Sequence, residues 1–539
     1  MHDIPMTTQQ ISPSFHGRRL WFPLATALLA ALGIAAIRLQ PELESNFKGL
    51  FTAMVMLLAV LLGLVWFLFL SRVGWRSRVI TIAVLALSIF GLAKALRVDG
   101  SVDGTGLPKL AWRWTPVRAP KVGALPGANP APAAPASAVA LENLPDVPQF
   151  FGAGRNGVAQ GVKLSHDWNA TPPRQLWRQP IGAGWSAFAV VGGHAFTEEQ
   201  LGEEEAVTCY DLLTGRLLWT HSNPVHFKQW QGGDGPRATP TVEGGRVFAI
   251  GATGILDCLD AATGRRIWSR DVLAENQLEN LTWGVSASPL VFDDTVIVTG
   301  GLTKGPSVLA YRRSDGAPLW RSGADKASYA SPAITTLAGR RVILTVNAAS
   351  LTAMDPAGGE VLLNYSFSDD KWPKASQPVV LDGDRVFISA GYGTGCALLE
   401  IKAGPDGKLF ANPLWKNLRM KTQFNSVAAR DGFLYGLDDG LLACVEISNG
   451  ERKWKAGRYG SGQTLLVDDV VIVQSESGAV ALAEAQPGGF KELGRIPALG
   501  AKTWNHPTLA GRYLLVRNSE EMACYELPLR TGQAATANR

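Results

Sequence analysis

The chain has 539 residues and a formal net charge of +5 at neutral pH, with 58 glycines and 17 tryptophans. A chain of this length exceeds one small core, and abundant glycine with scattered aromatic residues is typical of a turn-rich β protein. Residues 1–118 carry 12 Lys and Arg against 5 Asp and Glu, whereas the remainder carries 39 against 41. The basic excess therefore belongs to the N-terminal segment, and the charge distribution argues against a nucleic-acid partner.

The N-terminal segment contains three apolar runs, at about 20–37, 49–70 and 79–96. A run of about 20 apolar residues crosses a bilayer core about 30 Å thick. A cleaved signal peptide carries a single such run, so the three runs predict retained membrane spans. Residues 1–97 are therefore predicted to form a membrane domain with three transmembrane helices.

The arginines around these runs predict their orientation. Arg18 and Arg19 precede the first run, and Arg72, Arg76 and Arg78 lie between the second and third. Lys and Arg favour the cytoplasmic side of a membrane. We therefore expect a bacterial inner-membrane protein with a cytoplasmic N-terminus and everything after residue 96 in the periplasm.

Residues 98–148 are rich in Pro and Ala, as in APKVGALPGANPAPAAPASAVA at 119–140. Such a composition cannot bury a core, so this stretch is predicted to be an extended or disordered linker. The polar C-terminal residues 529–539 are predicted to be a disordered tail. The intervening residues 149–528 are expected to fold as one β domain.

A nine-residue phrase recurs along that domain. It is DLLTGRLLW at 211–219 and DAATGRRIW at 260–268, with variants at 312–320 and 446–454. Thr-Gly permits the positive φ of a tight hairpin, and the terminal Trp is suited to packing between neighbouring units. The phrase therefore predicts a repeated structural hairpin.

Each phrase is accompanied by a second hairpin built around Gly-Gly, Asp-Asp or Asp-Gly, as in ATPTVEGGRVFAIG at 238–251. Eight such hairpins begin near Ser186, Thr239, Ser286, Ser331, Gln377, Asn425, Gly462 and His506. Repeats of roughly 35–55 residues are typical of propeller blades. The predicted fold is all-β: an eight-bladed β-propeller of four-stranded antiparallel blades, preceded by an N-terminal α-helical transmembrane segment.

The sequence also predicts how the ring closes. The eighth unit ends at ACYELP (523–528) without a fourth strand, and QLWRQP (175–180) is a Trp-bearing strand without a preceding turn. We expect Gln175–Pro180 to complete the last blade, which removes the free edges of an open ring.

The D-x-x-T-G-x-x-x-W hairpins resemble the pyrroloquinoline-quinone-type propeller repeat over about residues 150–528. One branch of this family consists of quinoprotein dehydrogenases, including the membrane-bound glucose type with N-terminal spans before an eight-bladed propeller. Another branch is non-enzymatic, such as the propeller lipoprotein of the outer-membrane assembly machinery. The resemblance implies either pyrroloquinoline quinone with calcium and an Asp base, or a protein scaffold without a cofactor.

The residues favour the scaffold. Many dehydrogenases of the family stack the quinone on a disulfide between adjacent cysteines, and this chain has no Cys-Cys; no calcium triad of Asp, Asn or Glu can be assigned either. Four of its five cysteines precede an Asp or Glu by two residues, so they are predicted to be small buried side chains of equivalent strands, too far apart for a disulfide. No metal site is predicted.

The connections that enter each blade are longer and more varied than the tight turns, so any ligand or partner site is expected on the face where they gather. TEEQLGEEE (197–205) is expected to add an acidic loop there, with Glu198 and Glu199 within reach of Arg237. The alternative is that such residues only cap strands and fill the mouth of the channel. The candidate binding residues are Trp185, Glu198, Arg237, Trp283, Tyr329, Gln377, Lys421, Gln423, Asn425, Gln463, Trp504, Asn505 and His506.

Two functions remain open from the sequence. The preferred one is a membrane-anchored periplasmic propeller that binds a periplasmic protein or a small ligand through its loop-rich face. The alternative is a pyrroloquinoline-quinone-dependent dehydrogenase that oxidises an alcohol or sugar and passes electrons to the membrane. The missing cofactor residues favour a protein that is not an enzyme.

Overall fold

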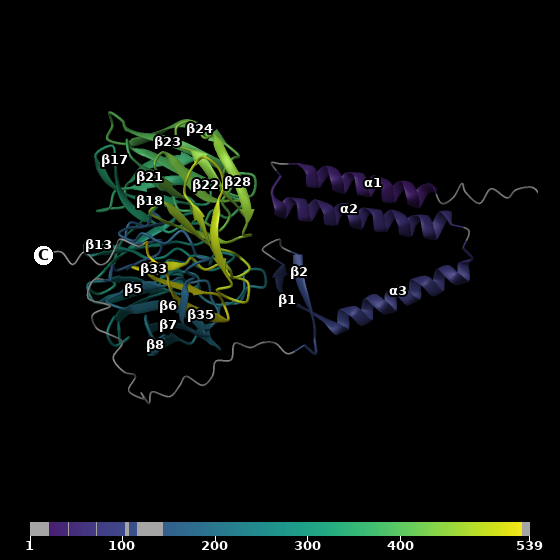
Figure 1. Ribbon diagram of the computed structural model, residues 1–539, viewed down its shortest axis with the longest axis horizontal. Coiled ribbons are helices and arrows are strands. Elements are labelled where there is room, and N and C mark those ends of the chain that lie inside the picture. The colour runs from purple at the N-terminus through teal and green to yellow at the C-terminus, as the bar shows by residue number, and fades with distance from the viewer. Residues whose placement is uncertain (1–20, 41–42, 72, 103–106, 116–143, 531–539) are drawn as a thin grey trace, which may run out of the picture. The chain divides into compact units, whose positions relative to one another are not determined.

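The computed structural model describes residues 21–40, 43–71, 73–102, 107–115 and 144–530 (Figure 1). The chain divides into an N-terminal helical unit and a β unit. The predicted stretch 119–140 and most of the predicted C-terminal tail lie outside the described residues.

The helical unit contains α1 (Trp21–Leu39), α2 (Ser45–Val65) continued by the π-helical turn η2 (Trp66–Leu70), and α3 (Trp75–Ala95). Three spans, Trp21–Leu39, Ser45–Leu70 and Trp75–Ala95, are long and apolar enough to cross a membrane. Large apolar side chains such as Leu28, Leu57 and Ile89 are exposed on them. Apolar residues on the outside of a helix are typical of contact with lipid.

The predicted linker that follows α3 contains secondary structure. The strands β1 (Leu96–Val102) and β2 (Leu107–Trp112) pair with each other, and we call this pair the β1–β2 hairpin. At its other end, Val147 exchanges two backbone hydrogen bonds with Val190 of the propeller. The expectation of an extended linker throughout 98–148 is therefore wrong at both ends, because short apolar segments there find partners.

The β unit is an eight-bladed propeller, as predicted, with four antiparallel strands in each blade and one added strand in blade 7. Blades 1 to 4 are β5 (Ala189–Val191) to β8 (Leu217–Asn223), β9 (Thr241–Glu243) to β12 (Arg266–Asp271), β13 (Leu290–Phe292) to β16 (Pro318–Ser322), and β17 (Ala333–Leu337) to β20 (Val361–Ser366). Blades 5 to 7 are β21 (Val379–Leu381) to β24 (Leu409–Asn417), β25 (Ala428–Arg430) to β28 (Arg452–Arg458), and β29 (Gln463–Val467) to β32 (Glu492–Ile496). Blade 8 is β33 (Thr508–Ala510), β34 (Tyr513–Arg517), β35 (Glu521–Glu526) and β4 (Arg174–Pro180).

The second and third strands of blades 1 to 7, between the first strand at the channel and the outer fourth strand, are as follows. They are β6 (His194–Leu201), β7 (Glu204–Asp211), β10 (Arg246–Ile250), β11 (Ile255–Asp260), β14 (Thr295–Thr299), β15 (Val308–Arg312), β18 (Arg340–Val346), β19 (Ser350–Met354), β22 (Arg385–Ala390), β23 (Gly395–Ala403), β26 (Phe433–Asp438), β27 (Leu441–Glu446), β30 (Val470–Gln474) and β31 (Val480–Glu484). A single helical turn, α4 (Val272–Glu275), follows blade 2.

The repeated phrase is the joint between blades. In DAATGRRIW, Asp260 Oδ1 accepts hydrogen bonds from the Thr263 amide and hydroxyl, and Gly264 adopts a φ of +69°. The Trp219 ring of the preceding blade lies against this turn, so that a Cβ at Gly264 would stand 2.5 Å from Trp219 Cε3. Trp219 Nε1 also donates to Ala261 O at 3.0 Å. The Gly is therefore required both for the backbone angle and for the docking of the neighbouring Trp.

Four of the five cysteines face these tryptophans. Cys209, Cys258, Cys444 and Cys524 pair across the ladder with Trp219, Trp268, Trp454 and Trp177 respectively. All five cysteines are buried free thiols. The small thiol leaves room for the indole ring across the strand, which confirms the structural role expected for these residues.

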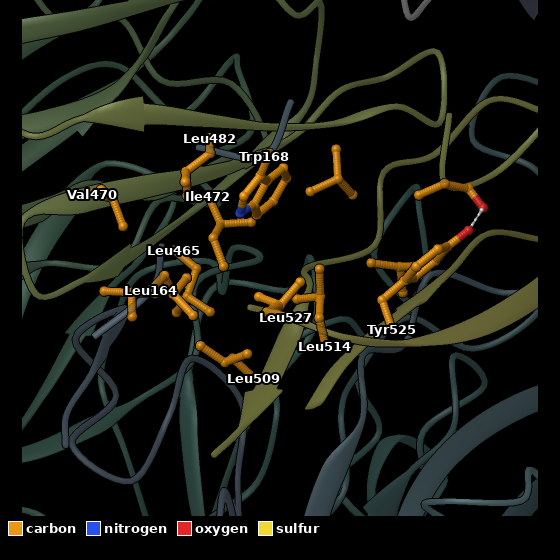
Figure 2. Packing of buried hydrophobic residues seen from close by; sticks show 14 of the residues in the cluster. Leu164, Trp168, Leu465, Val470, Ile472, Leu482, Leu509, Leu514, Tyr525 and Leu527 are labelled. Carbon is orange, nitrogen blue, oxygen red and sulfur yellow. Dashed lines mark hydrogen bonds between the residues drawn. The ribbon is translucent and has the colours of Figure 1, made fainter. Parts of the chain in front are cut away.

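Closure occurs through the predicted segment. β4 pairs with β35, placing Trp177 opposite Cys524, and Trp177 Nε1 donates to Leu212 O of blade 1 at 2.9 Å. Figure 1 shows blade 1 in blue beside the yellow strands of blade 8. The segment before β4 adds to the same core: Leu164 and Trp168 pack among blade 7 and 8 residues such as Leu482 and Leu514 (Figure 2).

Candidate functional site

The propeller has two unlike faces. One face carries the tight turns between the first and second strands and between the third and fourth strands of each blade. The opposite face, here called the loop face, carries the connections from each fourth strand to the next blade. On the loop face, five aromatic residues form what we call the aromatic arc: Phe424, Trp504, Trp185, Trp283 and Tyr329. They come from the entries of blades 6, 8, 1, 3 and 4. Four of the five, all except Phe424, are among the residues predicted for the site.

The arc consists of two stacks joined by one loop. Ring centroids of Trp185 and Trp504 are 5.0 Å apart, and those of Trp504 and Phe424 are 5.3 Å apart. Trp283 and Tyr329 make an edge-to-face pair at 5.7 Å. Edge-to-face and tilted packing at these separations is favourable for aromatic rings.

Residues 229–236 of the blade 2 entry join the two stacks. Trp185 Nε1 donates to Gly232 O, and a Cβ at Gly232 would stand 2.9 Å from Trp283 Cδ1 and 3.2 Å from Arg237 Nη2. A side chain at this position would therefore push the second stack away. Trp230, two residues before Gly232 in the same loop, is 52% exposed.

Two cations lie on the arc. Lys502 Nζ is 4.0 Å from the Trp504 ring centroid and 5.7 Å from that of Trp185. Arg237 lies 4.7 Å from the Phe227 centroid and donates to the carbonyls of Gly233 (2.6 Å) and Gly235. Burial lowers the pKa of Arg237 to about 10, against the opposing attraction of Glu205 and Asp234, so it remains a cation at neutral pH. The arc is thus an aromatic surface with positive charge.

Lys421 has a different environment. Its side chain is 2% exposed, and its Nζ lies 3.2 Å from Asp438 Oδ1 and donates to Leu418 O at 2.8 Å. Asp438 is fully buried, and its Oδ2 also forms an ion pair with Lys455 Nζ at 2.7 Å. This network joins the blade 6 entry to its own strands, so the structure does not bring Lys421 to the arc.

The predicted amides also serve the joints between blades. Gln463 Nε2 donates to Phe424 O and Trp504 O, and Asn505 Nδ2 donates to Ser186 O at 2.7 Å. Asn425 Nδ2 donates to Leu437 O at 3.0 Å within its own blade.

The two remaining glutamines are buried as well. The Gln377 side-chain amide pairs with the backbone of Ser331, and the backbone N–H of Gln423 donates to Asn425 Oδ1 at 3.3 Å. Gln463 and Asn505 hold the backbone under the arc, and the other amides are likewise buried among the entries.

The acidic stretch 197–205 is not a loop. It continues β6 and β7 as a hairpin that turns at Gly202–Glu203, and it buries Glu198, Glu199 and Glu205. Glu199 accepts hydrogen bonds from Thr208 Oγ1, Tyr210 OH and Gly182 N. Apolar residues at alternate positions, Val207 and Cys209, continue the strand pattern, which the run of charges obscured.

Glu198 does not pair with Arg237 as expected. The buried Arg517 donates instead to the Glu198 carbonyl at 2.8 Å and to Thr197 Oγ1 at 2.7 Å. Burial raises the pKa of Glu198 well above its usual value, and the neighbouring Glu205 and Asp257 raise it further. This carboxyl therefore belongs to the joint between blades 1 and 2.

His506 faces the central channel. Its Nε2 lies 3.0 Å from Thr464 O, and the Phe151 ring meets it edge to face at 4.9 Å. Burial lowers the pKa of His506 to about 4. The imidazole is therefore neutral near pH 7.

That channel is occupied by a segment that the sequence did not predict to lie there. Residues 144–159 run inside it as a plug. Val147 pairs with the first strand of blade 1, Val242 N of blade 2 donates to Pro148 O, and β3 (Val158–Ala159) runs parallel to β29 of blade 7. The plug therefore contacts the inner strands of blades on both sides of the ring.

Arg155 lies at the tip of the plug. Its buried guanidinium donates to Pro332 O (2.9 Å), Ser288 O (3.3 Å) and Pro289 O, which precede the first strands of blades 4 and 3. Burial lowers the pKa of Arg155 to about 9. The sequence signal was present in FFGAGRNG (150–157), an aromatic pair followed by closely spaced glycines.

A cavity of about 370 Å³ lies beside the plug. Its lining includes Pro145, Gln149, Phe151, Phe188, His506 and Leu509. Its walls come from the plug and from blades 1, 7 and 8, so it lies in the channel and is separate from the aromatic arc.

The described side chains give no acidic cluster for the calcium ion of a quinoprotein dehydrogenase. Across residues 21–115 and 144–530, where described, no three His, Cys, Asp or Glu side chains are grouped so that they could hold a metal ion. The acidic residues nearest the channel, such as Glu199, are bound by neighbouring strands. The donor set therefore gives no support to the dehydrogenase alternative.

Eight blades joined by D-x-x-T-G-x-x-x-W hairpins define a propeller of the pyrroloquinoline-quinone type. The comparisons agree: the profile of the family described as outer membrane protein assembly factor BamB matches residues 203–456. The repeats of this chain are thus similar to those of this propeller family over the matched residues.

Two curated relatives carry the same description. Outer membrane protein assembly factor BamB of Burkholderia pseudomallei is 25% identical over 361 residues, which covers 64% of this chain and 85% of the relative. That of Xanthomonas campestris is 27% identical over 302 residues, which covers 53% and 67%.

Solved structures with the same fold come from both branches. BamB from Moraxella catarrhalis matches with a TM-score of 0.50 at 16% identity, covering 66% of this chain and all of that one. Quinohemoprotein alcohol dehydrogenase from Comamonas testosteroni matches with a TM-score of 0.53 at 12% identity, covering 73% and 82%. At these identities the likeness concerns the fold alone.

Proposed function

We propose that this chain is a membrane-anchored periplasmic scaffold whose propeller binds another protein through the aromatic arc. The observation that carries the proposal is the continuity of the arc: Trp504, Trp185 and Trp283 are linked through one loop, with Arg237 and Lys502 beside them. Trp, Tyr and Arg are the residues enriched at the energetic centres of protein interfaces. The relatives named as outer membrane protein assembly factors support a role in assembling proteins of the outer membrane.

Photocrosslinking in intact cells tests this proposal. A photoreactive phenylalanine replaces the exposed Trp230, two residues from the Gly232 that joins the two stacks, and the matched control replaces Phe410, which is also exposed but lies on the outer strand β24. We expect one discrete adduct from position 230 and none of the same mass from position 410. The same adduct from both positions, or none from position 230, would refute the arc as the binding surface.

A second set of variants ties the adduct to the arc. Trp185→Ala and Trp504→Ala each remove one ring of the first stack, and truncating a central interface Trp costs about 2–4 kcal/mol of binding. The adduct from position 230 is therefore expected to disappear in both variants, with the propeller still folded by circular dichroism. Persistence of the adduct in folded variants would contradict the proposal.

The anchoring is tested separately. A reporter fused after Arg539 is expected to be active only in the periplasm, because the arginines between the second and third spans favour the cytoplasmic side. Cytoplasmic activity would overturn the orientation.

The dehydrogenase alternative has its own assay. Adding calcium and pyrroloquinoline quinone to the purified protein is expected to give no dye reduction with alcohols or sugars. Turnover that a chelator abolishes would refute the scaffold proposal and support the dehydrogenase alternative.

A further inference from the structure

The β1–β2 hairpin follows directly from the last candidate span. α3 ends at Ala95 and β1 begins at Leu96, with no residue between them. The open end of the hairpin is fastened to the helix end, since Arg113 N donates to Ala95 O at 2.8 Å and Arg113 Nε donates to Leu96 O at 3.2 Å. If α3 crosses the membrane, the hairpin must therefore begin at the membrane surface.

One face of β2 is apolar and uncovered. Side chains alternate along a strand, so Leu110 and Trp112 share a face. They are 56% and 44% exposed, and Trp114 in the following turn is 69% exposed. The Trp112 and Trp114 rings stack with centroids 4.8 Å apart. Two stacked indoles and a Leu in water are unfavourable unless something apolar covers them.

The residues between them are basic. Lys109 and Arg113 alternate with the apolar residues and are exposed, and Arg97 on β1 donates to Arg113 O at 3.5 Å. The sequence 107–115, LPKLAWRWT, contains no acidic residue. Indoles together with cations match the boundary of a bilayer, where Trp lies at the headgroup level and Lys and Arg meet lipid phosphates.

We propose that the β1–β2 hairpin lies on the outer surface of the membrane, with Leu110, Trp112 and Trp114 inserted among the headgroups, Arg113 and Arg97 at the phosphates of anionic lipids, and Lys109 on the opposite face of the strand in water. The proposal rests on α3 crossing the membrane and does not depend on what the propeller binds. A surface-bound hairpin fixes where the chain leaves the bilayer on its way to the propeller.

A fluorescent probe on each face of the strand tests the proposal in the full-length protein, in nanodiscs of phosphatidylcholine with or without phosphatidylglycerol. The variants are L110C on the apolar face and the neighbouring K109C on the basic face, each labelled with an environment-sensitive dye. The five native cysteines are buried, so labelling of the folded protein is restricted to the new thiol.

We expect the dye at position 110 to be quenched by nitroxide-bearing lipid and to lose most of its quenching by aqueous iodide, with the reverse at position 109. Equal iodide quenching at both positions would overturn the proposal, since the hairpin would then stand in water. Protection of position 110 from both quenchers would also overturn it, because the apolar face would then be covered by protein.

The lipid charge gives an independent readout. Lipid quenching at position 110 is expected to increase when phosphatidylglycerol is included, and that increase is expected to vanish in L110C combined with R97Q and R113Q. Equal quenching in charged and uncharged nanodiscs would refute the role assigned to the cations. A periplasmic reporter after Arg539 with no lipid contact at position 110 would refute the hairpin proposal alone, leaving the scaffold intact.

Discussion

Arg237 and Lys421 are both cations that precede the first strand of a blade on the loop face, yet they have opposite environments. Arg237 lies against the Phe227 ring and carbonyl oxygens, half-buried beside the aromatic arc. Lys421 is 2% exposed and paired with the fully buried Asp438. The two cations differ in their partners. A buried carboxylate that loses its cation destabilises the folded protein, whereas a carbonyl group that water can reach finds another hydrogen-bond donor.

Lys421→Ala is predicted to have the largest effect on stability. It removes one cation from the buried Asp438, and breaking a buried ion pair costs about 3–5 kcal/mol. Because Lys455 and Arg452 remain beside the carboxylate, we expect a loss of about 3 kcal/mol at the lower end of that range. Urea denaturation of the soluble propeller region measures it.

The matched control is Lys371→Ala, whose side chain is exposed and 3.7 Å from Asp369. An exposed pair contributes less than about 1 kcal/mol. Equal stability of Lys421→Ala and this control would show that Lys421 is not structural and would return it to the candidate site.

His506 provides the second test of buried loop-face residues. Its folded pKa of about 4 lies below the usual value of 6.5, so the folded protein favours the neutral imidazole. Its contribution is complete above about pH 6.5 and is lost as the pH falls from about 6.5 to about 4, up to about 3 kcal/mol. His506→Asn is expected to flatten this part of the stability–pH profile, whereas His194→Asn, at an exposed position, is expected to leave it unchanged. An unaltered profile in His506→Asn would contradict the assignment.

The fold could be predicted because its signals are local and repeated. Each D-x-x-T-G-x-x-x-W phrase contains both the turn and the Trp that docks on the next turn, as with Trp219 on Gly264. Ring closure could be predicted because the eighth unit lacks a fourth strand and the strand that contains Trp177 has no turn before it. These features are fixed by residues close in the sequence.

The site was predicted less completely because burial at the loop face depends on distant partners. Nothing near Lys421 in the sequence indicates Asp438. The charges of 197–205 resemble a solvated loop, although Arg517, more than 300 residues away, donates to the backbone carbonyl of Glu198 and helps to bury this strand. The plug was missed for the same reason: Arg155 contacts carbonyls of blades 3 and 4. The positions of the aromatic residues were easier to predict, because a Trp just before the first strand of a blade must lie on the loop face.

Glu198→Gln is predicted to stabilise the protein, by less than Lys421→Ala destabilises it. The folded pKa of Glu198 is raised, chiefly by burial, so its contribution is present at low pH and is lost as the pH rises. A neutral amide avoids that loss, and we expect a gain of about 1 kcal/mol at pH 8 and no gain at pH 4. Thermal denaturation at the two pH values measures it, with the exposed Glu243→Gln as control. A loss of stability at pH 8 would mean that the Glu198 carboxylate is ionised and stabilised in place.

Arg237→Ala is predicted to change stability least and binding most, which makes it the sharpest contrast with Lys421→Ala. Of the two carbonyls that lose its guanidinium, that of Gly233 belongs to a half-buried residue, where water replaces the donor, and that of Gly235 to a buried one. The free energy of unfolding is therefore expected to fall by about 1 kcal/mol. The Phe227 face loses its cation, and the arc loses positive charge beside Trp283. We therefore expect loss of the position 230 crosslink in a folded protein, while Arg216→Ala, an exposed change at a turn of the opposite face, leaves the crosslink intact. Unfolding of Arg237→Ala would instead place Arg237 with Lys421 among the residues that hold the blades together, and the arc would then lack a cation from blade 2.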